Sequence, residues 1–395
     1  MKIDDKTSHN SPSLRFPEFT GEWERCVLGD VLEFSNTRIN SSELNSGNYV
    51  STENILQNFQ GIVKARSIPE DTNVMAFSCG NILLSNIRPY LKKVWKATFN
   101  GGCSSDVFVL QANSNIDADY LHYVVANDKF IGFVMNGAKG VKMPRGDKNQ
   151  MKTYSLSLPS IKEQRKISRF LSFLDERIAV QNRLIEDLKK FKCAIVENVL
   201  NNRHPRMIRL GDIGSYIRGL TYSSNDVVEQ NGTFIMRSNN IVNGCSLDYY
   251  NDVVSVNKRI SKEQMLQNGD IIICMANGCS ALVGKSSFYD GKCPRSITVG
   301  AFCGIYRSEE PIVKWLFQTN RYRRYIWNSL QGGNGAIANL NGEDILRMSF
   351  PIPDAPVKNN CVKLLTSVDF MIENATSLCV LYTSQKEYLL RQMFI

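Results

Sequence analysis

The segment FLSFLDERIAVQNRLI, from Phe170 to Ile185, carries apolar residues at alternating spacings of three and four. This seven-residue rhythm is typical of a helix that packs lengthwise against another helix. The seam with its polar breaks reads Leu171, Leu174, Ile178, Gln181, Ile185, Leu188, Lys192, Ile195 and Val199. A helix of roughly 40 residues would be about 60 Å long, so the pattern predicts a partner along this seam.

The same pattern recurs 194 residues later in the chain. Asp175 recurs as Asp369, and the polar break Lys192 recurs as Lys386. The second seam reads Leu365, Val368, Ile372, Ala375, Cys379, Tyr382, Lys386, Leu389 and Met393. Because the acid, the lysine and the apolar seam recur at one offset, the simplest partner of the first helix is its own duplicate.

The repeat extends upstream of the helices. LGDVLEF at Leu28 matches LGDIGSY at Leu210, and GNILLSNI at Gly80 matches GDIIICMA at Gly269. Short β-type runs between Gly, Asn and Ser turns fill both upstream parts. The sequence therefore predicts a mixed α/β (α+β) chain of two tandem-repeat globular domains, separated by two long helices that form an antiparallel coiled coil with pseudo-twofold symmetry. The alternative is that each helix packs on its own domain as a surface helix.

The repeat also sets the expected domain boundaries. These are a tail at 1–13, a first globular domain at 14–158, a first helix at 159–200, a linker at 201–206, a second globular domain at 207–352 and a second helix at 353–395.

Charge and composition narrow the class of protein. Lys and Arg number 47 against 38 Asp and Glu, and this excess favours a polyanionic partner only weakly. The 11 cysteines include no Cys-x-x-Cys pair and the three histidines are scattered, so we expect no metal site and reduced thiols. No run of eighteen apolar residues and no signal peptide are found, which predicts a cytoplasmic protein without a membrane span.

The segment LSLPSIKEQRKISRFLSFLDERIAVQNRLIEDLKKFK, with the opening LRFPEFTGEWERCVLGD, resembles the specificity subunits of type I restriction–modification systems. The resemblance runs from about Leu14 to Ile395. Its strongest positions are Pro159, Glu163, Gln164, Ile167, Leu171, Asp175, Ile178 and Lys192.

The resemblance implies a function and a set of partners. Each globular domain would be a target recognition domain that reads one half of a bipartite double-stranded DNA sequence, and the coiled coil would set the spacing. Two methyltransferase subunits would dock on the helices, and two restriction/translocase subunits would join the full complex. S-adenosylmethionine is expected on the methyltransferase subunits, which methylate adenine; this chain would bind no cofactor and perform no chemistry.

Glu163 and Gln164 are the predicted docking residues for a methyltransferase subunit. The second copy reads PIPDAPVKNNCVKLL and places Lys358 and Asn359 at about those positions. The two docking sites therefore need not be equivalent.

Catalytic motifs are missing from the sequence itself. An amino-methyltransferase needs a Pro-Pro dipeptide, and the chain has none. GCSALVGKS from Gly278 has one residue too many between its glycines for a phosphate loop. EDLKK from Glu186 has nuclease-like spacing but falls on the predicted coiled coil, where a solvated face is the better interpretation.

Two stretches of the first copy are candidates for DNA contact. The Gly-rich stretch GAKGVKMPRGDKNQMK offers Lys139, Lys142, Arg145 and Lys148, since glycine permits close approach and cations meet phosphates. The stretch SNIRPYLKKVWKA offers Arg88, Tyr90, Lys92 and Lys93. An ordinary solvated loop is the alternative interpretation of the Gly-rich stretch.

The counterparts in the second copy carry fewer cations. QGGNGAIANLNGED offers Asn334, Asn339 and Asn341, and MANGCSALVGKSS offers Asn277 and Lys285. Asn suits adenine in direct readout, so the two copies are expected to divide phosphate and base contacts differently. The aligned Asn54 and Asn240 are either structural turn residues or base readers, and the aromatic residues of NRYRRYIW fit a core.

Two rival functions remain at this stage. A stand-alone DNA-binding scaffold without enzymatic partners would differ by failing to co-purify with a methyltransferase. A self-contained nuclease or methyltransferase would act as a purified single chain given S-adenosylmethionine and DNA.

Overall fold

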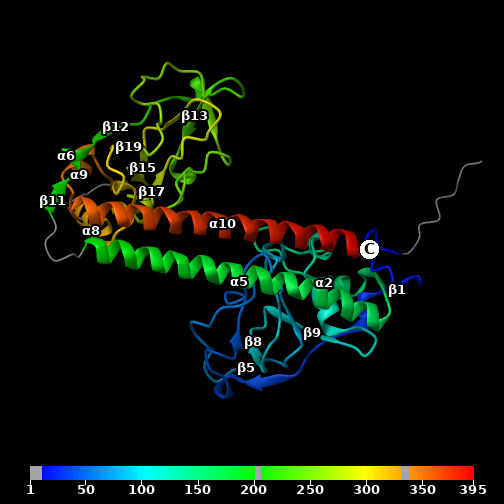
Figure 1. The fold of residues 1–395 in the computed structure, drawn as a ribbon. Coiled ribbons are helices and arrows are strands. Elements are labelled where there is room, and N and C mark those ends of the chain that lie inside the picture. Colours follow the sequence, from blue (N-terminus) through cyan, green and yellow to red (C-terminus); the bar gives the residue numbers. More distant parts are fainter. Residues whose placement is uncertain (1–10, 201–205, 331–337) are drawn as a thin grey trace, which may run out of the picture. The chain divides into compact units, whose positions relative to one another are not determined.

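The computed structural model describes residues 11–200, 206–330 and 338–395. The chain forms two compact units, the first from Met1–Asn182 with Ser377–Ile395 and the second from Arg183–Thr376. The division cuts both long helices, α5 (Ile161–Leu200) and α10 (Ala355–Met393) (Figure 1). Each globular domain therefore packs on part of each long helix, whereas the predicted boundaries at 159 and 353 had placed the helices outside the globular domains.

The described residues of unit 1 form three sheets. The central sheet has four antiparallel strands in the order β2-β9-β6-β7, and every residue of β6 is buried. A strand covered on both faces reads as a continuous apolar run, which explains the segment ILLS. The other two sheets have the orders β1-β10 and β3-β5-β8-β4. The strands are β1 (Glu24–Val27), β2 (Leu32–Phe34), β3 (Arg38–Asn40), β4 (Tyr49–Val50), β5 (Asn73–Phe77), β6 (Ile82–Ser85), β7 (Val94–Lys96), β8 (Gly101–Cys103), β9 (Val107–Ala112) and β10 (Ser155–Leu158).

Short helices complete unit 1. Asp117 caps α2 and Asp147 caps α4, each through a side-chain oxygen that accepts from backbone N–H groups of the first turn. The helices are α1 (Leu28–Val31), α2 (Ala118–Val125), α3 (Asp128–Asn136), α4 (Lys148–Lys152) and the 3₁₀ turns η1 (Ser41–Glu43) and η2 (Pro89–Leu91).

In unit 2 the residues that the structure describes form four sheets, with the orders β12-β19-β15-β17, β11-β21, β14-β13-β18 and β16-β20. The strands are β11 (Arg206–Arg209), β12 (Ser215–Arg218), β13 (Thr233–Met236), β14 (Val254–Val256), β15 (Ile271–Cys274), β16 (Ala276–Asn277), β17 (Ser286–Phe288), β18 (Ile297–Val299), β19 (Cys303–Arg307), β20 (Ala338–Asn339) and β21 (Ser349–Ile352). The helices are α6 (Leu210–Ile213), α7 (Val313–Leu316), α8 (Asn320–Leu330), α9 (Gly342–Leu346) and the 3₁₀ turns η3 (Ser224–Asp226), η4 (Ser238–Asn240) and η5 (Ser280–Leu282).

The two units repeat one topology and diverge in one sheet. The order β2-β9-β6-β7 recurs as β12-β19-β15-β17, and the pair β1-β10 recurs as β11-β21. The parallel pair β4-β8 recurs as β13-β18. The strands added to that pair differ, because β5 joins β8 in unit 1 whereas β14 joins β13 in unit 2. The mixed α/β class is confirmed, and the matching sheet orders agree with two copies of one unit.

The long helices run antiparallel within each unit. In unit 1 the Lys386 ammonium donates to Asp175 at 2.5 Å, and the Cys379 sulfur lies 3.3 Å from the Asn182 amide oxygen. Moving seven residues forward along α5 therefore moves the partner seven residues back along α10. In unit 2 Lys192 pairs with Asp369 at 3.0 Å. Both helices begin two residues after the predicted start, because Pro159 and Pro353 precede the first turn.

The predicted seam is the buried face of both helices. Ile178 and Tyr382 are half-buried, as is Lys386. The buried seam residues are Leu171, Leu174, Ile185, Leu188, Lys192, Leu365, Val368, Ile372, Ala375, Leu389 and Met393. In unit 1 the seam merges with the domain core, where Leu171 and Leu174 pack in one cluster with Leu389 and Met393.

Helix α10 is apolar beyond its seam. Among the residues that the structure describes, it is the one helix long and apolar enough to cross a membrane by length and composition, with a hydropathy of 1.3 in its most apolar window. The sequence had predicted no such candidate. The same helix carries Asp369 and Lys386, which form ion pairs with α5.

Candidate nucleic-acid interface and helix joint

The two cationic stretches of the first copy lie side by side in unit 1. Ile87 and Arg145 form an antiparallel bridge. The Arg88 N–H donates to the Pro144 carbonyl at 2.8 Å, and the Gly146 N–H donates to the Asn86 carbonyl at 3.1 Å. Residues 86–93 and 137–148, which lie about fifty positions apart in sequence, therefore form one surface, here called the cationic loop pair.

The cations of the first stretch differ in their freedom. Arg88 and Lys92 both adopt left-handed backbone conformations, with φ of 51° and 53°, an uncommon and strained state for such residues. The Lys92 ammonium pairs with Asp128 at 2.7 Å. Lys93 donates to the Thr52 carbonyl, and burial lowers the pKa of Lys93. Arg88 is thus the exposed cation of this stretch.

Two cations of the second stretch form ion pairs within the chain. Lys139 pairs with Asp147 at 2.9 Å, and the Arg145 guanidinium lies 3.2 Å from Asp106. The hydrogen bond from Lys139 lowers the pKa of Asp147. Arg145 keeps 54% of its side chain exposed, so it can still reach an outside phosphate.

Lys148 is held by aromatic rings. Its ammonium lies 5.4 Å from the Phe34 ring centroid and 5.1 Å from that of Phe108, a cation–π arrangement. Lys142 is exposed and, among the residues that the structure describes, neither it nor Arg88 has a carboxylate partner. The predicted phosphate contacts therefore fall most directly on Arg88, Lys142 and Arg145.

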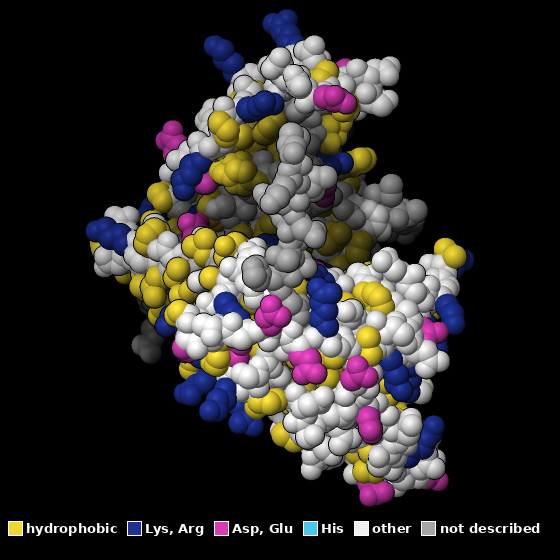
Figure 2. Space-filling view, turned by 90° about the vertical axis from the view of Figure 1, so that its right-hand side faces the viewer, with side chains coloured by type: hydrophobic (Ala, Val, Ile, Leu, Met, Phe, Trp, Pro, Cys, Tyr) yellow, Lys and Arg dark blue, Asp and Glu magenta, His cyan; other side chains and the backbone are white. Residues whose placement is uncertain are grey.

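The face drawn in Figure 2 carries Lys and Arg side chains in small groups among apolar and uncharged atoms. No single continuous basic surface is visible on this face.

The polar residues of the second copy meet on a short ladder in unit 2. β16 pairs with β20, so that Asn277 lies opposite Ala338 and Asn339 opposite Ala276. The Asn277 oxygen accepts from the Cys279 N–H at 2.9 Å, and its amide lies 3.3 Å from the Ser238 hydroxyl.

The remaining candidates of the second copy have mixed outcomes. Asn341 caps α9, because its oxygen accepts from the Asp344 N–H at 2.9 Å, and it occupies the position that Asp147 has in the first copy. Lys285 is half-buried. Asn334 lies outside the described residues.

Asn54 and Asn240 are structural turn residues. The Asn54 oxygen accepts from the Ser51 N–H at 3.0 Å, and the Asn240 oxygen accepts from the Arg237 N–H at 2.9 Å. Both side chains are buried within their units. The alternative that they read bases is wrong for this structure, because their polar atoms already have partners inside the fold.

Glu163 and Gln164 do not form an exposed docking surface. Each is 1% exposed. Glu163 receives both guanidinium arms of Arg15 at 2.7 Å, while the Gln164 oxygen accepts from the Asp117 N–H at 2.8 Å. This burial argues against a direct contact of their side chains with a partner, which stays a prediction. They tie the N-terminal segment and the start of α2 to the start of α5.

The second copy builds the same joint with different chemistry. Lys358 stands where the repeat places the counterpart of Gln164, and its ammonium pairs with Glu310 at 2.8 Å. Glu310 precedes α7, the counterpart of α2. In unit 2 the Lys358–Glu310 ion pair thus takes the place of the hydrogen bond between Gln164 and Asp117 in unit 1. The residues that differ from the Glu-Gln pair therefore serve a contact within the chain.

Asp175 and Asp369 are equivalent residues at the centres of two helix joints. In unit 1 the Tyr123 hydroxyl donates to Asp175 at 2.7 Å. In unit 2 the Trp315 indole N–H donates to Asp369 at 3.1 Å, and Lys314 lies 2.8 Å away. Tyr123 and Trp315 occupy matching places in α2 and α7. Sequence reasoning found the acid and the lysine but missed these aromatic donors, although their alignment in the repeat was available as a signal.

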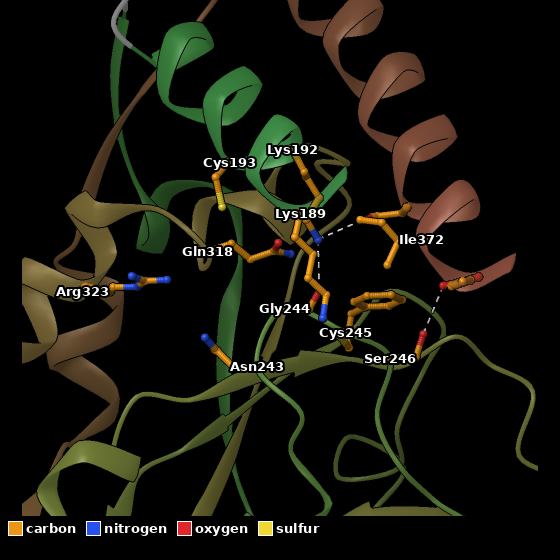
Figure 3. A pocket seen from close by; sticks show the side chains of 13 residues that line it. Lys189, Lys192, Cys193, Asn243, Gly244, Cys245, Ser246, Gln318, Arg323 and Ile372 are labelled. Carbon is orange, nitrogen blue, oxygen red and sulfur yellow. Dashed lines mark hydrogen bonds and ion pairs between the residues drawn. The ribbon is translucent and has the colours of Figure 1, made fainter. Parts of the chain in front are cut away.

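A cavity of about 240 Å³ adjoins the joint of unit 2 (Figure 3). Lys192 reaches from α5 to donate both to Asp369 and to the Gly244 carbonyl at 3.2 Å. Asn243 and Gln318 line the cavity from the globular part of unit 2. Lys192 therefore binds the loop around Gly244 to both helices as well as joining the helices to each other.

Comparisons with known proteins agree with this architecture. Residues 20–190 match the family model described as Type I restriction modification DNA specificity domain. The EcoKI specificity subunit from Escherichia coli (strain K12) is 32% identical over 149 residues, which cover 36% of this chain and 31% of that protein. The StySPI specificity subunit from Salmonella potsdam gives the same values. The alignments thus span about a third of these relatives.

The solved type I restriction-modification S subunit from M. genitalium shares the fold at a TM-score of 0.63, with 14% identity and coverage of 98% of this chain and 99% of that chain. This likeness concerns the fold alone, and it extends over both units. Residues 20–190 thus match a type I restriction modification DNA specificity domain, and the chain is similar in sequence to type I restriction enzyme specificity subunits over about a third of its length.

Proposed function

We propose that this chain is the DNA sequence-specificity subunit of a type I restriction–modification complex, in which each globular domain reads one half of a bipartite target. The observation that carries the proposal is one fold built twice with different loop chemistry. Unit 1 presents the exposed cations Arg88 and Lys142, whereas unit 2 presents the exposed amide of Asn339 on the β16-β20 ladder. Two readers of one architecture and different surfaces suit two different half-sites.

The chain directs the chemistry of its partners and performs none. Its sequence has neither the Pro-Pro dipeptide of an amino-methyltransferase nor a phosphate-binding loop. S-adenosylmethionine belongs on two methyltransferase subunits, and two restriction/translocase subunits complete the assembly. The complex acts on DNA inside the cell.

The helices offer a docking surface other than Glu163 and Gln164. Four large apolar side chains of α10 recur every seven residues and are each at least 41% exposed, namely Val357, Leu364, Met371 and Leu378. A second apolar stripe beside a buried seam fits packing of a further helix. We place the methyltransferase contact on this stripe.

Mapping methylated adenines in a strain that carries this chain and its methyltransferase partner tests the proposal. Exchanging one globular domain at Pro159 and at Arg206 should change one half of the methylated sequence and leave the other unchanged. A change in both halves would refute separate reading. Methyl transfer by the purified chain alone, or failure to co-purify with the methyltransferase, would refute the division of labour.

A further inference from the structure

The cationic loop pair ends in a stiff hairpin that spans residues 139–145. The Lys139 N–H donates to the Arg145 carbonyl at 3.0 Å, and the Arg145 N–H donates back at 2.9 Å. Gly140 supplies the turn with a φ of +96°, a conformation that L side chains rarely adopt. The Arg88 N–H, on the neighbouring stretch, donates a hydrogen bond to the Pro144 carbonyl. The tip is therefore fixed by backbone bonds on two sides.

This tip presents apolar side chains to solvent. Val141 is fully exposed at 100%, and Met143 is 47% exposed. Tyr90, on the neighbouring stretch, is 48% exposed. Exposed apolar residues are ordinary when scattered singly, but Val141 and Met143 stand together on one hairpin and flank the cation Lys142.

We propose that the 139–145 hairpin inserts Val141 and Met143 into a DNA groove and partly unstacks one base step in the half-site that unit 1 reads. The inference rests on the proposed DNA-reading function and adds a contact with bases to it. Cations beside the tip match a polyanionic ligand, and they hold the phosphates while the apolar side chains reach the bases. Apolar wedges of this kind bend the duplex, and a tip ordered before binding loses little conformational entropy on insertion.

Insertion is assigned to unit 1 alone. The glycine-rich counterpart in the second copy falls largely on residues 331–337, which lie outside the described residues. Nothing in the proposal requires the second domain to bend its half-site.

The test uses the full-length chain and the target found by methylation mapping. Duplexes labelled at both ends report bending by energy transfer, and 2-aminopurine in place of single adenines other than the methylated one reports unstacking. Wild type should bend the duplex and raise the fluorescence at one step. Val141→Ser with Met143→Ser should lose both signals and about tenfold in affinity with an unchanged salt slope, as expected when apolar rather than ionic contacts are removed.

A matched control is Val63→Ser, since Val63 is 49% exposed on another loop of the same unit; it should bend DNA as wild type does. Equal melting temperatures would show that the tip variant is folded. Bending and affinity of the tip variant at wild-type levels would overturn the insertion, as would a loss of methyltransferase binding with DNA contacts intact. A wild-type chain without sequence-specific binding would instead overturn the proposed function, and the insertion with it.

Discussion

Lys192 of α5 and Asp369 of α10 form a buried ion pair at 3.0 Å. Their equivalents in the repeat, Lys386 of α10 and Asp175 of α5, form a second ion pair. The helices run antiparallel, so the lysine of one copy meets the acid of the other. Two equivalent joints arise from one sequence pattern. Buried polar residues between paired helices can fix the register of the pair.

Asp369→Asn should destabilise unit 2 more than Lys192→Met does. The asparagine would leave two cations, Lys192 and Lys314, without their carboxylate, and loss of one partner of a buried pair costs roughly 3–5 kcal/mol. Lys192→Met leaves Asp369 paired with Lys314 and should cost less. Denaturant midpoints measure both, with Lys190→Met, on a side chain 75% exposed, as the neutral control. Equal losses would argue against this ranking.

His122 should make unit 1 sensitive to acid. Burial, aided by Lys386, lowers the pKa of His122 from 6.5 to about 4. The unfolded chain then binds the proton more readily, so the contribution to stability is complete above about pH 6.5 and declines as the pH falls toward 4. His122→Gln should reduce the loss of unfolding free energy between pH 7 and pH 4.5 by roughly 2–3 kcal/mol. Parallel stability curves for the two proteins would contradict this assignment.

Glu163→Gln should act on folding of the N-terminal segment. The change weakens the two hydrogen bonds from Arg15, and the hydrogen bond to Glu163 raises the pKa of Arg15. We expect each of Glu163→Gln and Arg15→Met to cost about 2–3 kcal/mol and the double variant to cost less than their sum. Calorimetry measures the cycle. Additive losses would mean that the pair is not coupled, and weaker methyltransferase binding without lost stability would restore the direct docking role.

The salt dependence of DNA binding should separate Lys142 from Lys148. Lys142 is an exposed cation on the hairpin tip, whereas Lys148 lies over Phe34 and Phe108. Lys142→Gln should reduce the slope of log affinity against log salt by about one unit on all sequences. Lys148→Gln should change it less, although the sequence had grouped both among the phosphate contacts. A larger effect at Lys148 would reverse the assignment.

Four residues inserted after Gln181 should lengthen the helix pair by about 6 Å, close to two base pairs of DNA. The repeat alone points to Ala375 as the place for a matching insertion. The structure instead places the matching insertion at Cys379, because Cys379 contacts Asn182. In an antiparallel helix pair, the residue that lies opposite the insertion is its spatial neighbour and not its equivalent in the repeat. Methylated sites should keep both half-sequences and gain one or two base pairs in the gap. An active variant with an unchanged gap would exclude the helices as the ruler.

The sequence by itself determined the fold class, the repeat and the seam. Burial along a helix follows a fixed period, so the apolar positions from Leu171 to Leu188 and from Leu365 to Ile372 could be recognised without coordinates. The recurrence of Asp175 and Lys192 as Asp369 and Lys386 likewise marked both joints.

Only the tertiary structure decided which groups meet. Whether Glu163 faces a partner or Arg15 depends on how a segment nearly 150 residues away returns to the helix, and no local pattern records that return. The same holds for Arg88, whose neighbour Pro144 comes from a distant loop. Periodicity reports which face of an element is buried, whereas the partner on that face is fixed by long-range packing that depends on the whole chain.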